Sequence, residues 1–120
     1  MTYTVRNSRE GDDIALNGIR CGGTYRAITI ERDDNGAVVG MGGIVYGPES
    51  IIAFSSLDRN DRPDKRTVVK AARQVIKIIA DCNAPVYATI DEHEPTAEKF
   101  LRTIGFVDYN DQGVLIWQRQ

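Results

Sequence analysis

The 120-residue chain has few of the side chains on which metal and redox sites depend. It contains one histidine and two cysteines, and Cys21 and Cys82 lie far apart without C-x-x-C or Cys/His ligand spacing. This pattern argues against a zinc site. It is typical of two free thiols in a reducing compartment, so we expect a cytoplasmic protein without a metal.

Long apolar runs and a strong net charge are also missing. No stretch approaches the ~20 apolar residues that span a bilayer, and no segment has the basic, apolar and small-residue order of a signal peptide. The net charge of −2 gives no general attraction to nucleic acid or anionic membrane, so neither is expected as a partner. The 42% hydrophobic and 27% charged fractions are typical of a globular protein, and the length predicts one domain over residues 1–120.

The most informative stretch is EPTAEKFLRTIGF at residues 94–106. Its apolar side chains have the i, i+3, i+4 and i+7 spacing of one helix face, namely Ala97, Phe100, Leu101 and Ile104. Pro95 suits the first helical position, and Gly105 suits the left-handed residue after the end. The segment therefore predicts a three-turn helix that leads into a buried strand.

The first half of the chain predicts a short strand at residues 3–6 and a brief helix over residues 9–19, capped by Ser8. A meander of three antiparallel strands follows at residues 25–32, 37–46 and 51–57. Asn35 and Gly36 favour a tight turn between the first two. Three glycines in the middle strand, Gly40, Gly42 and Gly43, indicate a bulge or a close backbone approach.

The longest helix is predicted over residues 65–81, with an apolar stripe of Val68, Ala72, Val75 and Ile79. Residues 86–90 follow as a strand parallel to residues 51–57, because a helix lies between them. Two strands, at residues 105–109 and 114–118, complete the chain. This order predicts an α/β (α+β) fold with a mixed sheet.

The motif A-x-x-F-L-x-x-x-G-F at residues 97–106 resembles the fourth-helix motif of the GNAT superfamily of N-acetyltransferases. Within it, FLRTIGF is most similar to the small acetyltransferase-like and internal virion proteins of short-tailed bacteriophages. The resemblance implies a single GNAT-like domain with a mixed, mostly antiparallel sheet flanked by helices. The N-terminal helical region is shorter than the family's.

GNAT enzymes hold the pyrophosphate of acetyl-CoA on a glycine-rich loop that opens the long helix. The corresponding residues 58–67 contain no glycine, and three aspartates there would oppose an anion. We therefore expect no cofactor. If acetyl-CoA does bind, the candidate ligands are Arg59, Arg62, Lys65, Arg66 and Thr67.

The family's proton-donating tyrosine corresponds to Leu101, and its asparagine corresponds to Glu94. No glutamate stands in residues 51–57 to act as the general base. If the protein is an enzyme, the substitutes are Tyr109 as acid and Glu49 as base. His93 among Asp91, Glu92 and Glu94 is either a base held by carboxylates or part of a solvated cap.

One ridge on the predicted long helix is formed by Arg66, Lys70, Arg73 and Lys77. It is either a solvated face or a contact surface for phosphate, nucleic acid or an acidic partner protein. Two functions stay open. The favoured one is a catalytically degenerate phage-type protein that acts in virion assembly or binds a host or other protein, in the host cytoplasm or the virion. The alternative is an acetyl-CoA-dependent N-acetyltransferase of a protein or small-molecule amine. An edge strand at residues 114–118 leaves a homo-oligomer open.

Overall fold

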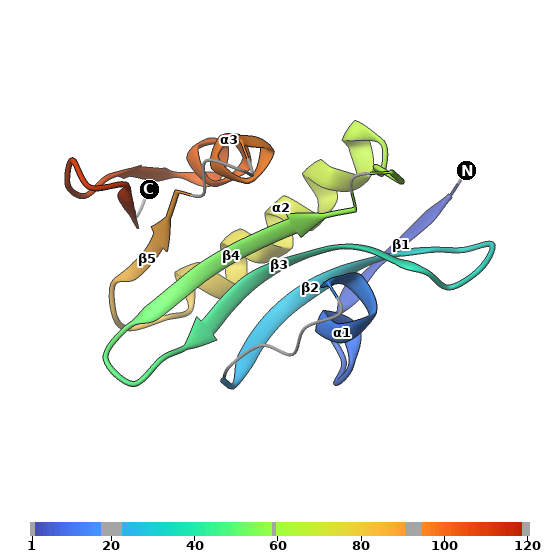
Figure 1. The fold of residues 1–120 in the computed structure, drawn as a ribbon, viewed down its shortest axis with the longest axis horizontal. Helices are drawn as coiled ribbons and strands as arrows, with labels where there is room; N and C mark the ends of the chain where they lie inside the picture. Colours follow the sequence, from blue (N-terminus) through green and yellow to red (C-terminus); the bar gives the residue numbers. More distant parts are fainter. Residues whose placement is uncertain (1, 18–22, 59, 91–94, 119–120) are drawn as a thin grey trace.

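The computed structural model describes residues 2–17, 23–58, 60–90 and 95–118. Its strands form one seven-stranded sheet in the order β1-β2-β3-β4-β5-β7-β6 (Figure 1). The strands are β1 (Tyr3–Asn7), β2 (Tyr25–Arg32), β3 (Val38–Tyr46), β4 (Ile51–Leu57), β5 (Val86–Thr89), β6 (Phe106–Asp108) and β7 (Val114–Trp117). The helices are α1 (Asp12–Asn17), α2 (Lys65–Ala80) and α3 (Pro95–Ile104).

The sheet is mixed and mostly antiparallel, as the sequence predicted. Of its neighbouring strand pairs only β4 and β5 run parallel, because α2 connects them across one face. Figure 1 shows α1 in front of the sheet and α2 behind it. Both α2 and α3 line a cavity with Ile28, Gly42 and Ser55, so these two helices lie over the same face of the sheet.

The long helix α2 begins and ends within one residue of its predicted bounds, but its buried stripe is rotated from the prediction. Val75 and Ile79 are buried as expected, whereas Val68 and Ala72 are only half-buried. Their places in the core are taken by Ala71 and Ile78. The difference arises because α2 packs mainly on β2 and β3, which lie to one side of it.

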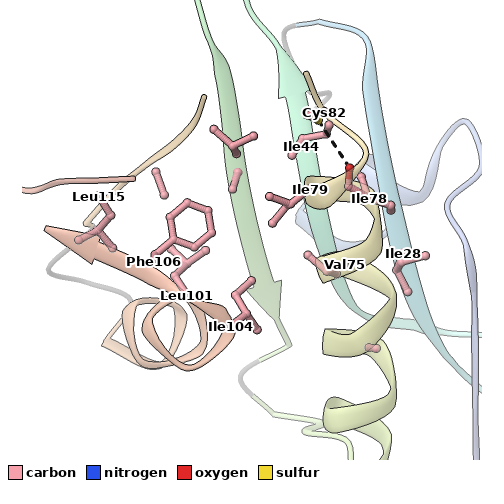
Figure 2. Close-up of a cluster of buried hydrophobic side chains, with 14 of the residues drawn as sticks. Ile28, Ile44, Val75, Ile78, Ile79, Cys82, Leu101, Ile104, Phe106 and Leu115 are labelled. Carbon is pink, nitrogen blue, oxygen red and sulfur yellow. Dashed lines mark hydrogen bonds between the residues drawn. The ribbon is translucent and has the colours of Figure 1, made fainter. Parts of the chain in front are cut away.

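The α3 prediction is confirmed in detail. Pro95 is its first residue, and Gly105 follows its last residue with φ of 121°, a conformation that side-chain-bearing residues rarely adopt. Leu101 and Ile104 are buried with Phe106 and Leu115 (Figure 2). The indole N–H of Trp117 donates to the Ile104 carbonyl over 2.9 Å and fastens the end of α3 to β7.

The glycines of β3 mark both a bulge and close contacts. The pairing of β2 with β3 shifts register between Ile30 and Glu31, where the sequence predicted irregularity. A Cβ on Gly43 would lie 2.3 Å from the Arg26 carbonyl oxygen, so no side chain fits there. On Gly42 a Cβ would lie 4.0 Å from the ring of Phe100, which places that ring against β3.

The first helix differs from its prediction. It begins at Asp12 and not at residue 9, and Ser8 does not cap it. The Ser8 hydroxyl instead bonds to the Thr29 hydroxyl over 2.7 Å, because the backbone N–H of Ser8 is already joined to β2 through Ala27.

No helix in the described part of the chain is long and apolar enough to cross a membrane.

A buried carboxylate fastens α1 to the sheet. Asp12 accepts two hydrogen bonds from the Arg6 guanidinium, at 2.8 and 3.1 Å. It also accepts from the Arg9 backbone N–H at 2.7 Å and from the Thr29 hydroxyl at 2.9 Å. Burial raises the pKa of Asp12, but these hydrogen bonds outweigh it and leave that pKa below its usual value.

Candidate functional site

The sheet opens between its two parallel strands. β5 pairs with β4 only at the start of β4, where Ile51 faces Val86 and Ile52 faces Tyr87. Residues 53–57 have no partner in β5, and Figure 1 shows the two strands diverging beyond their paired end. A splay of this kind leaves backbone donors and acceptors of β4 without a neighbouring strand, so this is the candidate site.

The cavity beside this splay is small and mostly apolar. It is lined by residues of β2, β3, β4, α2 and α3, with Arg62 and Thr96 at its polar side, and its volume is about 30 Å³. That is room for a water molecule or two, whereas ligand pockets are typically about 300–1,000 Å³. Phe100 and Ala97 of α3 line it, and the Phe100 ring lies against Gly42 of β3, so α3 sits close to the sheet here.

The loop after β4 holds a carboxylate of its own where an anion would need free amides. The Asp58 carboxylate accepts the backbone N–H groups of Asn60 at 2.8 Å and Asp61 at 3.1 Å. Asp58 thus saturates two donors of the loop that precedes α2 and adds a negative charge there. The sequence shows the aspartates of this loop but does not reveal this role of Asp58. An Asp followed two and three residues later by polar residues is its only sequence signal.

One ion pair and one hydrogen bond hold the same loop in place, and a second ion pair of Arg32 goes to Asp34 in the turn between β2 and β3. Arg32 of β2 contacts Asp61 at 2.5 Å and Asp34 at 2.7 Å, and Asp34 first and then Asp61 raise the pKa of that guanidinium. Arg62 extends over the cavity and donates from Nη1 to the Thr96 hydroxyl of α3 over 3.4 Å. The predicted phosphate ligand Arg62 therefore joins the loop to α3.

The N-terminus of α2 is the part of the predicted cofactor site that stays open. Asp64 precedes the helix but makes no side-chain hydrogen bond to its backbone. Its carboxylate accepts from the Thr67 hydroxyl instead, and that bond lowers the pKa of Asp64. Lys65 and Arg66 are exposed beside it. Arg59, the fifth predicted ligand, lies outside the described residues.

The two predicted catalytic substitutes do not line the cavity. Tyr109 is 57% exposed beyond β6, and its ring packs edge to face on Tyr87 with 5.2 Å between centroids. Glu49 is exposed in the turn before β4, and it lines a shallow groove that Tyr87 also borders. Leu57, at the other end of β4, lines the cavity, so Glu49 lies about 20 Å from that end.

The position that the sequence comparison matched to the GNAT tyrosine is filled by a core residue. Leu101 is 4% exposed and packs among the buried side chains of α3, β6 and β7. In Figure 2 it lies beside Phe106 and Leu115, on the other side of β4 from Val75 and Ile28. Leu101 cannot donate a proton, and its side chain lines no described cavity.

Of the other candidates, only Cys82 lies among the described residues. His93 with Asp91, Glu92 and Glu94 lies outside the described residues, and so does Cys21. The Cys82 thiol is buried and donates to the Ile78 carbonyl over 3.5 Å. Within the described ranges, no three His, Cys, Asp or Glu side chains come close enough together to hold a metal ion.

The predicted partner-binding ridge is exposed along α2, as helical spacing requires. Its members are Arg66, Lys70, Arg73 and Lys77, which we call the basic ridge, and none makes an ion pair with a described residue. Like charges three or four residues apart on a helix destabilise it. The basic ridge therefore opposes the stability of α2.

Lys70→Glu is expected to raise the free energy of unfolding by about 0.5–1 kcal/mol. The substitution turns the repulsion of Lys70 with Arg66 and Arg73 into attraction. Urea denaturation followed by circular dichroism measures it. Lys70→Gln, which only removes the repulsion, should fall between Lys70→Glu and the wild type. A Lys70→Glu chain less stable than the wild type would contradict the account.

Comparison with known proteins identifies the fold. No protein-family description and no curated protein sequence matches the chain. A protein described as a phosphinothricin N-acetyltransferase has a similar crystal structure, with a TM-score of 0.64, 15% identity and 98% of each chain covered. The KacTA–DNA complex gives a TM-score of 0.55 at 13% identity, covering 97% of this chain and 92% of that one. The crystal structure of AtaTR bound with AcCoA gives a TM-score of 0.52 at 15% identity, and the match covers 96% of this chain and 92% of that one.

The chain therefore has the GNAT fold of N-acetyltransferases. The element order and the mostly antiparallel sheet flanked by helices agree with this class. Identities of 13–15% establish the fold alone. Whether the fold carries acetyl transfer here depends on the residues of the splay.

Proposed function

We propose that this protein is a catalytically degenerate GNAT-fold protein that acts by binding another protein. The observation that carries the proposal is the Asp58 carboxylate, which occupies the backbone amides of Asn60 and Asp61 ahead of α2. A coenzyme's pyrophosphate would have to displace this carboxylate and would then lie beside its charge. An enzyme that loses a proton donor is slowed, but one that loses its phosphate site loses the cofactor's anchor.

Two further observations support the proposal. The cavity beside the splay has a volume of only about 30 Å³, and Phe100 and Ala97 of α3 form part of its wall. Leu101, at the position of the family's tyrosine, is part of the hydrophobic core. Coenzyme binding would require α3 to move, and acid catalysis would require a donor from elsewhere in the chain.

The second candidate is an acetyl-CoA-dependent N-acetyltransferase that modifies a protein or small-molecule amine. It is favoured by the splay of β4 from β5 and by the N-terminus of α2, where Asp64 leaves the helix amides without a side-chain cap. Lys65, Arg66 and Thr67 would then hold the phosphates, helped by the helix dipole. AtaTR, which has the same fold, binds AcCoA.

The test is thermal unfolding of the full chain with and without acetyl-CoA, together with an acetyl-transfer assay on amine substrates. We expect no shift and no transfer. A coenzyme at a hundredfold excess over its Kd would add about 2.7 kcal/mol of stability, which raises the Tm of a chain of this size by about 10 °C. Such a shift, or transfer above the uncatalysed rate, would overturn the proposal in favour of the second candidate.

A matched pair of variants tests the role assigned to Asp58. Asp58→Gly frees the amides of Asn60 and Asp61 and is expected to bind coenzyme A better than the wild type. Asp111→Gly removes the same charge from the exposed turn before β7 and should bind no better than the wild type. Equal binding by both variants would mean that charge alone, and not the occupied amides, limits the affinity.

Virion assembly is the finer part of this proposal, and FLRTIGF is its support. The motif belongs to α3, whose Leu101 and Ile104 are buried and whose Phe100 lines the cavity. These are packing roles that a non-catalytic relative would retain. Mass spectrometry of purified phage particles tests the assignment if the gene lies in a phage genome. Absence of the chain from particles would leave a host protein as the partner.

A further inference from the structure

The charge of the chain is unevenly distributed, and α2 is where the positive charge gathers. Its sequence KRTVVKAARQVIKIIA has five basic residues and no acidic one, although acidic residues outnumber basic ones in the whole chain by 17 to 15. Surface helices usually carry both signs, because oppositely charged pairs stabilise them. A helix without any carboxylate departs from this rule, and such departures are commonest at functional surfaces.

The best-fixed cations of this protein are paired, and the basic ridge differs from them. Arg6, Arg32 and Arg102 each contact two carboxylates. The four side chains of the basic ridge contact none among the described residues. The ridge extends over three turns, about 16 Å at the rise of an α-helix. It therefore presents a line of four charges for which the described chain supplies no counterpart.

An apolar row runs along α2 beside the basic ridge. It consists of Val69, Ala72, Ile76 and Ile79, whose spacing of three, four and three residues puts them on one side of the helix. Val69 is 42% exposed, and Ala72 and Ile76 are half-buried. Ile79 is buried in the core at 1% exposure, so the accessible part of the row is Val69 together with the half-buried Ala72 and Ile76.

We propose that the basic ridge and the apolar row together bind an acidic amphipathic helix of a protein partner. This inference rests on the proposed binding function and names its surface and the chemistry of its partner. A helix with carboxylates at i, i+4, i+7 and i+11 matches the basic ridge charge for charge. Its adjacent apolar side chains would cover Val69 and Ile76. A nucleic-acid backbone would use the charges but gain nothing from the apolar row.

The experiment uses a labelled synthetic peptide with glutamates at those four positions, leucines on the adjacent face and alanine elsewhere, and it measures fluorescence anisotropy. Saturable binding is expected, and Lys70→Glu/Arg73→Glu should weaken it at least about tenfold. The control Arg9→Glu/Lys99→Glu makes the same change in net charge at exposed sites away from α2 and should change affinity less than about twofold. Val69→Ser should weaken binding severalfold.

Each other outcome contradicts the inference. No saturable binding, or equal losses in the ridge variant and the control, would show that the surface is only a solvated face. A DNA duplex or single-stranded RNA that binds through Lys70 and Arg73 but ignores Val69→Ser would make the partner a nucleic acid. Self-association that Lys70→Glu/Arg73→Glu abolishes in sedimentation would make it a second copy of this chain.

This inference and the proposed function can be refuted separately. Lys70 and Arg73 lie on the exposed side of α2, whereas Ala71 and Val75 on its inner side line the cavity. A coenzyme found in the splay would refute the degenerate function without changing peptide affinity. A peptide that does not bind would refute the surface without restoring a cofactor site.

Discussion

The Leu101→Ala substitution is expected to lower the free energy of unfolding by about 2–5 kcal/mol relative to the wild type. Leu101 is 4% exposed and packs with Ile104, Phe106 and Leu115, so truncation leaves a cavity in the core. Urea denaturation followed by circular dichroism measures the loss. Val107→Ala is the matched control, because Val107 lies on the exposed side of the neighbouring strand β6 and should cost less than about 1 kcal/mol.

Leu101→Tyr tests the same position for function. If position 101 were an open catalytic position, the GNAT tyrosine would be tolerated there and would raise any transfer activity. In a filled core it adds volume and an unpartnered hydroxyl, and we expect it to cost about 1–3 kcal/mol and to give no acetyl transfer. A stable Leu101→Tyr chain with new activity would show that the splay still serves as an active site.

The second large effect is expected from Arg6→Ala, which should lower the free energy of unfolding by about 3–5 kcal/mol at neutral pH. The Arg6 and Asp12 side chains are 14% and 9% exposed, so removal of Arg6 leaves a buried carboxylate with only its bonds from Arg9 and Thr29. The double variant Arg6→Ala/Asp12→Ala should lose less than the sum of the two single variants. Additive losses would mean that the pair is not coupled.

The pH dependence of this loss follows from the sign of the Asp12 pKa shift. The pKa of Asp12 is lowered in the folded protein, so its stabilisation is present above the unfolded value near 3.8 and is lost as pH falls through the folded value. Without Arg6, burial raises that pKa. The deficit of Arg6→Ala should therefore shrink from about pH 6 to about pH 3. A constant deficit would contradict the assigned charge of Asp12.

The fold was predictable because its strongest signals are local. The apolar spacing of α3 and the glycine after it identify the helix. Asn35 and Gly36 identify the tight turn between β2 and β3. Each signal depends on a few neighbouring residues. The rotation of the α2 stripe depends instead on where β2 and β3 lie beneath it, which helical periodicity cannot supply.

The site was predictable only in outline. The absence of glycine before α2 pointed to a lost phosphate site, but the Asp58 bonds that fill its amides depend on loop geometry. The position of Phe100 in the cavity depends on how α3 sits against Gly42 of β3. Ser8 was predicted as a helix cap because it precedes the first helix. Its actual partner, Thr29, could not be identified because it lies 21 residues away in the sequence. Nothing in a short polar segment indicates that Asp12 will be buried.

The most direct test of the central claim is a titration of the ¹⁵N-labelled chain with coenzyme A, followed by amide chemical shifts. The account predicts that the amides of Asn60, Asp61 and Thr67 show no saturable shift up to about 5 mM coenzyme, well above a Kd of about 1 mM. Saturable shifts at these three amides, with a Kd in the micromolar range, would contradict it. The phosphates would then have displaced Asp58, and the protein would be a transferase.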